Sequence, residues 1–338
     1  MFRQIRIMLF VLLVAALTLA ACDGQATAPT SNGSAQTTVP GPIQGADHRP
    51  TAATVSVTPT PGNGGQTSSL PTFSHIFIIV LENKEASRII DNPEARYINS
   101  LAAQYARATN FYGTRHPSLP NYLALTGGDT FGITEDCTDC FIAADNIASQ
   151  LETAGRSWKA YMESMPSPCF VGDGQALYRQ KHNPFIYYDN VRTDPARCNK
   201  IVPLTQLEAD LQANALPDYV WITPNMCNSM HDCSIATGDA WLKTWAPRIL
   251  ASPAWQNNGV LFVTFDDGNT DSGCCTYAAG GKIDTLVISP LVKPGFTSNV
   301  PYDHYSLLRT IEEAWGLPLL GKANCDCTAP MIDFFMTR

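Results

Sequence analysis

The feature that most constrains this fold is a series of short apolar runs, each of which ends abruptly in polar residues. Three runs are clear: residues 259–265 before Asp266-Asp267, residues 75–81 before Glu82-Asn83, and residues 219–223 before Pro224-Asn225. Continuous apolar runs of this length, rich in β-branched and aromatic residues, are typical of strands buried on both faces. We therefore expect a central sheet whose strands carry oxygen-bearing side chains at their carboxyl ends.

Helical patterns lie between and after these runs. Helices are predicted near residues 97–107, 145–154, 239–250 and 305–315, and further strands near 108–112, 157–161 and 285–289. Strands that alternate with helices indicate an α/β fold, here a three-layer α/β/α sandwich around a mainly parallel sheet. Ligands of such sheets bind beyond the carboxyl ends of the strands, where the polar pairs fall.

A proline-bracketed serine precedes one further helix. Pro117 and Pro120 restrict the backbone on both sides of Ser118, and Pro120 suits a first helical turn because its missing N–H has no partner there. Gly127-Gly128 is expected to end that helix. Ser118 would then lie at a helix N-terminus, where free N–H groups and the helix dipole favour an anion. The alternative is a serine that only caps the helix.

The first 72 residues are expected to lie outside the folded domain. Arg3 and Arg6 precede an apolar run that ends in Leu19-Ala20-Ala21-Cys22, which resembles a bacterial lipobox. Residues 1–22 are therefore predicted to be a lipoprotein signal peptide, cleaved before Cys22, whose thiol carries a lipid anchor. An ordinary secretory signal with a chance cysteine is the alternative.

The next segment differs sharply from the rest of the chain. Residues 23–72 contain no Phe, Trp or Tyr and are rich in Thr, Gly, Pro and Ser, which is typical of a disordered tether. Residues 73–338 are enough for one sizeable domain with its own core. The protein is therefore predicted to be exported as a cell-surface or periplasmic lipoprotein that touches the membrane only through its anchor.

Cysteine use agrees with export. Of the 11 cysteines, setting aside Cys22 leaves 11 − 1 = 10, an even number that suggests up to five disulfides in an oxidising compartment. The expected pairs are Cys137/Cys140, Cys227/Cys233 and Cys169/Cys198, with Cys274 and Cys275 pairing outward to Cys325 and Cys327. Outward pairing is expected because a disulfide between adjacent residues is strained. The alternative is a zinc site that includes Cys137 and Cys140.

The charge balance restricts the partners. The formal net charge is −8, whereas a nucleic-acid surface needs clustered Lys and Arg. No nucleic-acid partner is expected, and the domain is expected to act as a monomer.

Four motifs in order resemble a known family. They are Leu81-Glu82-Asn83, His116-Pro117-Ser118-Leu119-Pro120-Asn121-Tyr122, Thr223-Pro224-Asn225 with Asn228 and His231-Asp232, and Phe265-Asp266-Asp267-Gly268. Together they resemble the bacterial phosphoesterase family of acid phosphatases and phosphatidylcholine-type phospholipases C, within the alkaline-phosphatase superfamily. The resemblance spans essentially all of 73–338, so it implies an alkaline-phosphatase-like fold and a phosphoesterase catalytic domain.

The resemblance also implies a site. The implied metal ligands are Glu82, Asn83, Ser118, Asp266 and Asp267; the implied catalytic residues are Ser118, His116, His231 and His304; and the implied substrate-binding residues are Asn121 and Asn228. His304 has the weakest support, and His75 and His182 are interpreted as structural or surface histidines. The segment from Ser118 to Tyr122 also echoes a sulfatase signature, but position 122 is Tyr instead of Arg, which argues against a sulfatase.

The chemistry of these residues supports the same interpretation. A serine hydroxyl is a weak nucleophile near neutral pH, and a divalent cation stabilises its alkoxide. Oxygen ligands favour Ca²⁺, Mg²⁺ or Mn²⁺, although a zinc-like site that includes His231 remains an alternative. A protonated histidine can supply the leaving oxygen with a proton.

These observations lead to one main expectation and two alternatives. The main expectation is an exported, metal-dependent phosphomonoesterase that acts through a phosphoserine intermediate on small or lipid-borne phosphate esters. The first alternative is a phosphodiesterase of the phospholipase C type. The second, from a different class, is a lipoprotein that binds a ligand without turnover.

Overall fold

The computed structural model describes residues 70–174 and 177–336. The predicted signal peptide, the lipid anchor at Cys22 and almost all of the predicted tether lie outside these residues. Within them, no helix is both long enough and apolar enough to cross a membrane. Leu70, which sequence analysis placed in the tether, is buried in the main hydrophobic core, so the packed domain includes it.

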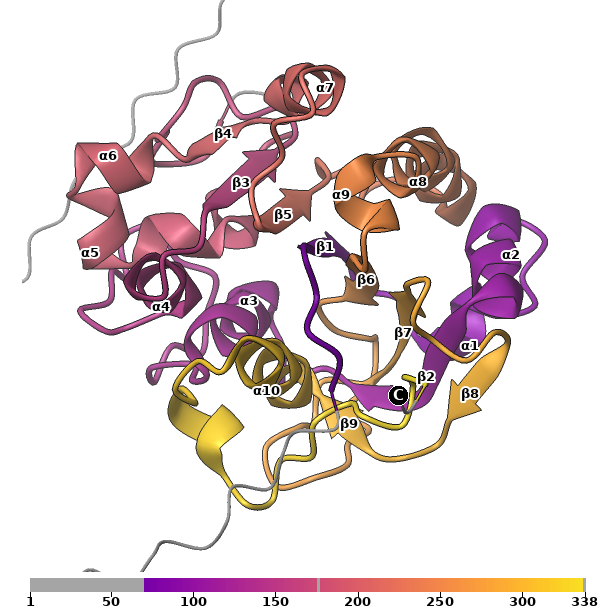
Figure 1. Cartoon of the computed structure of the whole chain (residues 1–338). Helices are drawn as coiled ribbons and strands as arrows, with labels where there is room; N and C mark the ends of the chain where they lie inside the picture. The colour runs from indigo at the N-terminus through magenta and orange to yellow at the C-terminus, as the bar shows by residue number, and fades with distance from the viewer. Residues whose placement is uncertain (1–69, 175–176, 337–338) are drawn as a thin grey trace, which may run out of the picture. The chain divides into compact units, whose positions relative to one another are not determined.

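A nine-stranded sheet forms the centre of the domain (Figure 1), in the order β4-β3-β5-β1-β6-β7-β2-β8, with β9 also pairing with β2. The strands are β1 (Ile76–Leu81), β2 (Ala106–Tyr112), β3 (Trp158–Met162), β4 (Ile201–Pro203), β5 (Tyr219–Thr223), β6 (Val260–Phe265), β7 (Lys282–Ile288), β8 (Phe296–Ser298) and β9 (Tyr302–Asp303). Every neighbouring pair is parallel except the two pairs that involve β7. The expected mainly parallel sheet is confirmed.

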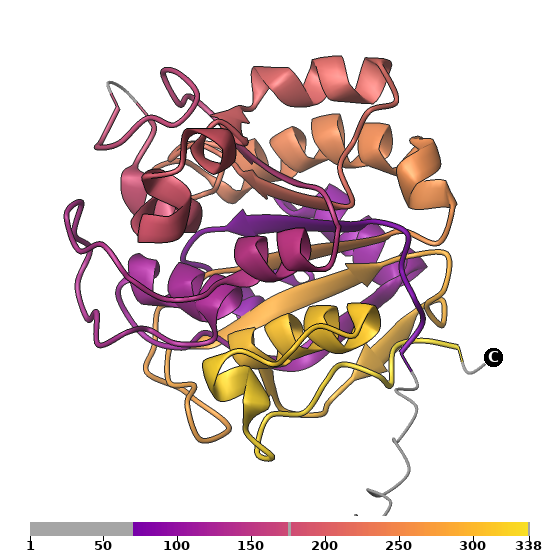
Figure 2. The same cartoon turned by 60° about the vertical axis from the view of Figure 1, so that its left-hand side comes forward.

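Helices cover both faces of this sheet (Figures 1 and 2). One face carries α3 (Ser118–Gly127), α4 (Ile147–Thr153) and α10 (His304–Trp315), and the other carries α2 (Arg96–Gln104), α7 (Thr205–Gln212), α8 (Ile235–Leu250) and α9 (Pro253–Gln256). Short helices complete the chain: α1 (Ala86–Ile89), η1 (Gln180–His182), η2 (Pro184–Tyr187), α5 (Asp189–Arg192), α6 (Pro195–Cys198) and η3 (Gly321–Asn324). This is the expected three-layer α/β/α sandwich.

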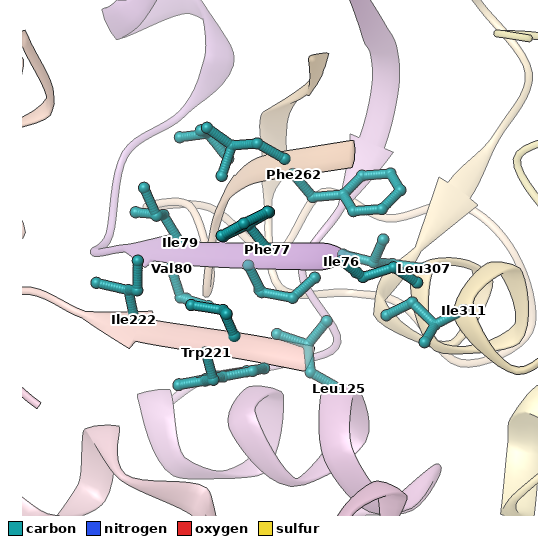
Figure 3. Close-up of a cluster of buried hydrophobic side chains, with 14 of the residues drawn as sticks. Ile76, Phe77, Ile79, Val80, Leu125, Trp221, Ile222, Phe262, Leu307 and Ile311 are labelled. Carbon is teal, nitrogen blue, oxygen red and sulfur yellow. The ribbon is translucent and has the colours of Figure 1, made fainter. Parts of the chain in front are cut away.

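The central strand β1 is buried along its whole length, because β5 and β6 pair with its edges and helices cover its faces. Figure 3 shows side chains of β1 among those of its neighbours β5 and β6 and of helices α3 and α10. Such complete burial explains why β1 reads as a continuous apolar run without alternation. The strand is thereby fixed, and so is the position of Glu82 directly after it.

Some elements were not expected from the sequence. The strands β4, β8 and β9 have only two or three residues, too few for a periodic pattern. The reversed direction of β7 was also not predicted, because an apolar strand buried on both faces looks the same in either direction. Helix α8 begins at Ile235, four residues earlier than predicted, because the Ser234 side chain accepts a hydrogen bond from the Thr237 N–H and caps it.

Five disulfides are present in the described residues. Three are the expected pairs: Cys137–Cys140, Cys169–Cys198 and Cys227–Cys233. The zinc alternative is therefore wrong, since the thiols of Cys137 and Cys140 are not free to bind metal.

The predicted outward pairing is also wrong, because each remaining pair closes within its own loop as Cys274–Cys275 and Cys325–Cys327. The Arg309 guanidinium of α10 donates hydrogen bonds to the carbonyl oxygens of Cys325 and Thr328. These bonds hold the loop of residues 325–328 against α10, and within that loop Cys327 pairs with Cys325.

Helix α2 begins without a capping side chain of its own, and Asp239 of α8 takes that role. The Asp239 carboxylate accepts hydrogen bonds from the N–H groups of Tyr97, at 3.0 Å, and Ile98, at 2.8 Å. It thereby satisfies two free donors at the helix start and ties two helices of the same layer together.

We therefore predict that Asp239→Ala lowers the free energy of unfolding by about 1–2 kcal/mol, the usual effect of losing a cap. Asp239→Asn keeps one acceptor oxygen and should lose less. Urea unfolding of the three proteins measures this, and equal stability of all three would contradict the capping role.

Candidate active site

The carboxyl ends of β1 and β6 lie side by side, because the two strands pair in register up to Leu81 and Phe265. Each strand is followed at once by two polar residues, which therefore meet. The Asn83 backbone N–H donates to Asp266 Oδ1 at 2.9 Å, and its side-chain amide donates to Asp267 Oδ1 at 2.5 Å. Asn83 has a positive φ of 48°, a left-handed conformation that asparagine tolerates better than most residues.

Helix α3 brings Ser118 to the same place. The helix runs from Ser118 to Gly127 and is capped by Gly128, whose φ of 70° is left-handed, in line with the predicted end at Gly127-Gly128. Ser118 is buried, and its Oγ donates a hydrogen bond of 3.3 Å to Glu82 Oε2. The structure thus brings Ser118 together with four of the residues that the resemblance implied.

A cavity of about 400 Å³ opens at this point. It is lined by Asn83, His116, Pro117, Ser118, Asp136, Lys181, His231, Asp267, Gly268 and Asn269. Of the predicted site residues, Asn83, His116, Ser118, His231 and Asp267 line it directly. Such a polar cavity can hold a small charged group beside the serine hydroxyl.

Three carboxylates, of Glu82, Asp266 and Asp267, are fully buried beside the serine. Burial raises the pKa of Glu82 to about 8, against hydrogen bonds such as the one from the Tyr122 hydroxyl that lower it. Burial, with the nearby charges of Asp267 and Glu82, raises the pKa of Asp266 well above its usual range. Asp267 has a partner in His116, but no Lys or Arg of the described residues forms an ion pair with Glu82 or Asp266, so the ionised forms of these two carboxylates need a further positive charge.

The predicted ligand set has the chemistry of a site for a hard cation. Each of its five side chains offers an oxygen ligand: Glu82, Asn83, Ser118, Asp266 and Asp267. Asp266 Oδ2 is buried without any hydrogen-bond partner. Such an unpaired carboxylate oxygen is unfavourable unless a cation compensates it. No three His, Cys, Asp or Glu side chains in the described part of the chain are arranged as a ready metal-binding group, so Asn83 and Ser118 would have to complete the ligand set.

His116 lies in the cavity wall, where both ring nitrogens face acceptors. Nδ1 is 2.8 Å from Asp267 Oδ2, and Nε2 is 3.0 Å from the carbonyl oxygen of Thr270. Because both neighbours are acceptors, both nitrogens must donate, so the ring carries a positive charge. In agreement, the hydrogen bond with Asp267 raises the pKa of His116 to about 9.

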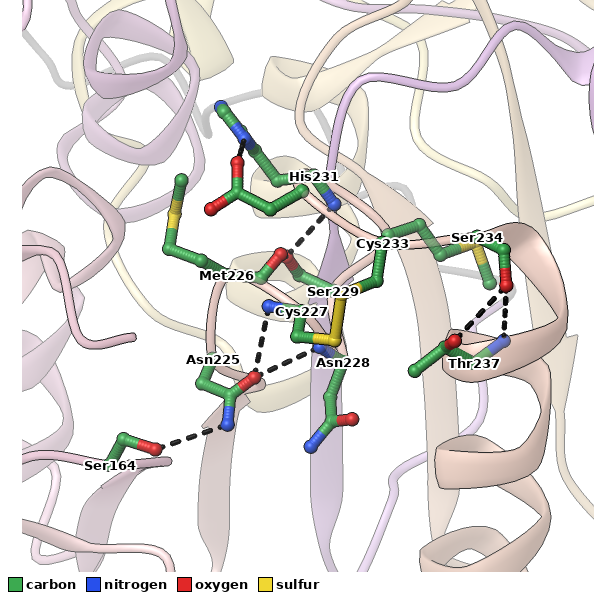
Figure 4. Close-up of a disulfide and its surroundings, with 12 residues drawn as sticks. Ser164, Asn225, Met226, Cys227, Asn228, Ser229, His231, Cys233, Ser234 and Thr237 are labelled. Carbon is green, nitrogen blue, oxygen red and sulfur yellow. Dashed lines mark hydrogen bonds and ion pairs between the residues drawn. A yellow bond between two sulfur atoms is a disulfide. The ribbon is translucent and has the colours of Figure 1, made fainter. Parts of the chain in front are cut away.

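His231 approaches the cavity from the turn after β5. Figure 4 shows the Cys227–Cys233 disulfide that closes this turn and the hydrogen bonds that fold it. Burial lowers the pKa of His231, while a 2.7 Å hydrogen bond between its Nδ1 and Asp232 raises it. The net effect is a lowered pKa, so His231 loses its charged form at a lower pH than a free histidine does.

Asn225 and Asn228 shape the same turn. Asn225 Oδ1 accepts hydrogen bonds from the backbone N–H groups of Cys227 and Asn228 (Figure 4). The Asn228 side chain donates to the Glu163 carboxylate at 3.0 Å and does not line the cavity. In this geometry Asn228 contacts Glu163, not the position of a substrate.

Asn121 differs in the same way from the role that the resemblance implied. It is fully buried, and its Oδ1 accepts from the backbone N–H groups of Thr114 and Arg115. Its Nδ2 donates to three carbonyl oxygens, those of Arg115, Pro117 and Ser118. Both ends of the amide are therefore used by the loop that carries His116 and Ser118, and none is left to contact a phosphoryl oxygen.

His304 also lies away from the cavity. It is fully buried at the start of α10, and its Nε2 donates a 2.5 Å hydrogen bond to the backbone oxygen of Asp266. Burial lowers the pKa of His304 to about 4. A neutral, enclosed ring cannot protonate a leaving group, so in this geometry His304 holds Asp266 in place.

The structure adds residues that sequence analysis missed. His182, interpreted there as structural or surface, is buried with its Nε2 3.2 Å from Glu82 Oε2 and its ring stacked on Tyr122. Burial, with the nearby charge of Lys181, lowers the pKa of His182 to about 3, so it is neutral. No local pattern could have found it, because η1 lies far from Glu82 in the sequence.

Glu163 and Glu85 were missed as well. Glu163 directly follows β3, as Glu82 follows β1, and this signal could have found it. The Glu85 carboxylate accepts hydrogen bonds from the backbone N–H groups of Asn269, Thr270 and Lys282. It therefore fixes the loop that follows Asp266-Asp267.

The fold has relatives among solved structures. An alkaline phosphatase superfamily protein from Vibrio parahaemolyticus superposes with a TM-score of 0.55, over 78% of this chain and 72% of that chain, at 13% identity. At so low an identity the comparison shows the fold alone. It confirms the expected alkaline-phosphatase-like architecture.

Sequence relatives define the class. The chain is 37% identical to the phosphatidylinositol-3-phosphatase of Mycobacterium tuberculosis over 265 residues, 78% of this chain and 84% of that protein. It is 33% identical over 264 residues to an acid phosphatase of Aspergillus fumigatus, covering 75% of this chain but only 57% of that protein. Fold, site and relatives together define a phosphoric ester hydrolase.

The family follows from a match over residues 89–318. The chain belongs to the phosphoesterase family, as the four motifs predicted.

The site geometry predicts the effect of changing Asn121. Asn121→Asp places a carboxylate oxygen against three carbonyl oxygens that now receive hydrogen bonds. We expect the free energy of unfolding to fall by about 3 kcal/mol, since buried groups lose their partners. Asn110→Asp is the control, because this less buried amide donates only one hydrogen bond, of 3.2 Å to the Asn299 carbonyl, and its Oδ1, which accepts from the Tyr112 hydroxyl, is kept in the variant. It should lose less than about 1 kcal/mol. Urea unfolding of both variants measures this, and equal losses would contradict the role of Asn121.

Proposed function

We propose that this protein is a metal-dependent phosphomonoesterase in which Ser118 attacks the phosphorus and forms a phosphoserine intermediate. One observation carries the proposal: Ser118 opens helix α3 and lines a cavity together with Asp267, and the buried carboxylates of Glu82 and Asp266 lie next to these two residues. A serine that only capped the helix would not need buried charges beside it, and neither would a protein that only bound its ligand.

Different residues would orient the nucleophile, attract the phosphate and protonate the leaving group. Glu82 Oε2 accepts the hydrogen bond of the Ser118 hydroxyl and so points Oγ at the incoming phosphate. His116, with its charge held by Asp267, attracts the phosphate dianion into the cavity. His231, which also lines the cavity, can donate a proton to the leaving oxygen in its charged form.

The metal would be held by Glu82, Asn83, Ser118, Asp266 and Asp267. An ion bound there draws charge from a phosphoryl oxygen and favours the ionised form of the serine. The oxygen donors favour Ca²⁺, Mg²⁺ or Mn²⁺ over Zn²⁺. His231 pairs with Asp232 and lies outside this donor set, which speaks against a second, zinc-like site built on it.

We further propose export and anchoring at Cys22. Support comes from the N-terminal sequence and from five disulfides in the described residues, which persist in oxidising compartments.

The choice between monoester and diester follows from charge. Two cationic groups, His116 and Lys181, line the cavity with Ser118, and a monoester brings two negative charges where a diester brings one. We expect a chromogenic phosphomonoester to be hydrolysed with a kcat/KM at least tenfold above that of its diester analogue, since 1.4 kcal/mol of preference gives that factor. Ser118→Ala should abolish turnover and keep the fold.

The outcomes of this experiment are distinct. Preference for the diester would support the phospholipase C type of activity. Full activity of a folded Ser118→Ala protein would remove Ser118 as the nucleophile, and no hydrolysis of either ester by the wild type would leave only binding.

The donor set predicts which buried carboxylate binds metal. Asp266→Asn replaces a charged ligand with a neutral amide, so bound metal and activity should be lost together. The control is Asp284→Asn, at an equally buried carboxylate of β7 that pairs with Arg107 at 3.0 Å. It should lose stability but keep its metal in elemental analysis after dialysis. Full metal content in Asp266→Asn would contradict the assignment.

The pH profile tests His231. Because burial lowers its pKa from the ordinary value, its charged form is lost as the pH rises through this lowered pKa, and kcat/KM should fall on the alkaline side of it. Asp232→Asn removes the partner that raises this pKa, so the alkaline limb should move to lower pH. Asp326→Asn, at an exposed aspartate, is the control. An alkaline limb that stays in place in Asp232→Asn would exclude His231 as the proton donor.

A further inference from the structure

Two charged residues of the cavity wall, Lys181 and Asp136, have been given no direct contact with the substrate so far. Lys181 Nζ lies 2.7 Å from Asp136 Oδ2, and both side chains line the cavity beside Ser118. They come from segments far apart in the sequence, since Asp136 precedes the Cys137–Cys140 disulfide and Lys181 lies in η1. A salt bridge in a cavity wall can be structural or can take part in binding.

The position of Lys181 favours a part in binding. It is the one lysine or arginine among the residues that line this cavity. The next residue, His182, lies next to Glu82 and stacks its ring on Tyr122 of α3, so η1 packs beside the buried carboxylates. An ammonium group has three N–H donors, and the hydrogen bond with Asp136 uses one of them. Two donors are left for a ligand in the cavity.

Asp136 lies where an anion is favoured. Its Oδ1 accepts a 3.0 Å hydrogen bond from the backbone N–H of Leu119, in the first turn of α3, and its Oδ2 accepts from Lys181. One carboxylate oxygen thus accepts a hydrogen bond from a free N–H group of the helix start, and the other accepts one from the Lys181 ammonium group. A phosphate oxygen next to Ser118 needs the same two donors.

We propose that Lys181 binds a non-bridging oxygen of the substrate phosphate, and that the Asp136 carboxylate occupies this anion position in the free enzyme and gives way to the phosphate. The inference rests on the proposed function and adds a residue that determines affinity at the same cavity. A structural salt bridge and this competition make different predictions. If the salt bridge only holds the loop, removal of either partner weakens phosphate binding. If Asp136 competes with the phosphate, removal of Lys181 weakens phosphate binding, whereas removal of the Asp136 charge strengthens it.

The test is titration of the full-length chain with inorganic phosphate by isothermal calorimetry, with the metal loading kept the same throughout. Lys181→Gln should weaken phosphate binding roughly tenfold or more, the effect of losing one charge-assisted hydrogen bond. Asp136→Asn should tighten it several-fold, because a competing negative charge is removed. Lys181→Arg keeps the charge and should keep most of the affinity.

A matched salt bridge elsewhere provides the control. Lys159 Nζ lies 2.6 Å from Asp210 Oδ2, and the lysine is similarly exposed, 26% against 20% for Lys181. Lys159→Gln and Asp210→Asn should leave phosphate affinity within about twofold of the wild type, since the pair joins β3 to α7 away from the cavity.

The outcomes separate this inference from the proposed function. Weaker binding in both Lys181→Gln and Asp136→Asn, or unchanged binding in Lys181→Gln, overturns the inference while the wild type still hydrolyses monoesters. A wild type that neither binds phosphate nor hydrolyses monoesters overturns both.

Discussion

The structure depends on one electrostatic constraint: three carboxylates, of Glu82, Asp266 and Asp267, are buried together at the carboxyl ends of β1 and β6. Burying like charges is unfavourable unless hydrogen bonds and a cation compensate them. The surrounding groups supply part of that compensation through the amide and N–H of Asn83 and the hydroxyl of Tyr122. The remaining imbalance makes the site suited to a hard cation and, through it, to a phosphate.

Much of this could be predicted from the sequence, because the signals are local. An apolar run that ends in Glu82-Asn83 or Asp266-Asp267 predicts both a buried strand and a polar edge of the sheet. Pro117 and Pro120 predict the helix start at Ser118. Together with the helical patterns between the strands they predicted the three-layer fold, and the resemblance of the four motifs added the family and the set of site residues. The same local signals could not give the direction of β7, because a strand buried on both faces carries no mark of it.

The groups that the sequence did not reveal act across the fold. Lys181 and Asp136 line the cavity, and His182 lies against Glu82. They come from the short helix η1 and from an irregular segment without periodic pattern, so only the packed structure places them there. Asn121 and His304 differ from these groups, because sequence analysis placed both in the site. In the structure both side chains are buried and form hydrogen bonds with the backbone. Asn121 thereby stabilises the loop that carries Ser118, and His304 contacts the residue that follows β6. A motif fixes the neighbourhood of a residue more firmly than its role.

The central claim is that the Ser118 hydroxyl attacks phosphorus, and one measurement tests it most directly. The wild-type enzyme is mixed with a phosphomonoester, quenched in acid within a turnover and digested for mass spectrometry. We expect a fraction of the peptide that contains Ser118 to carry the mass of one phosphoryl group, located on that serine by fragmentation. A pre-steady-state burst of product with the phosphoryl group on another residue would contradict the account. Hydrolysis with no phosphorylated peptide at any quench time would contradict it as well.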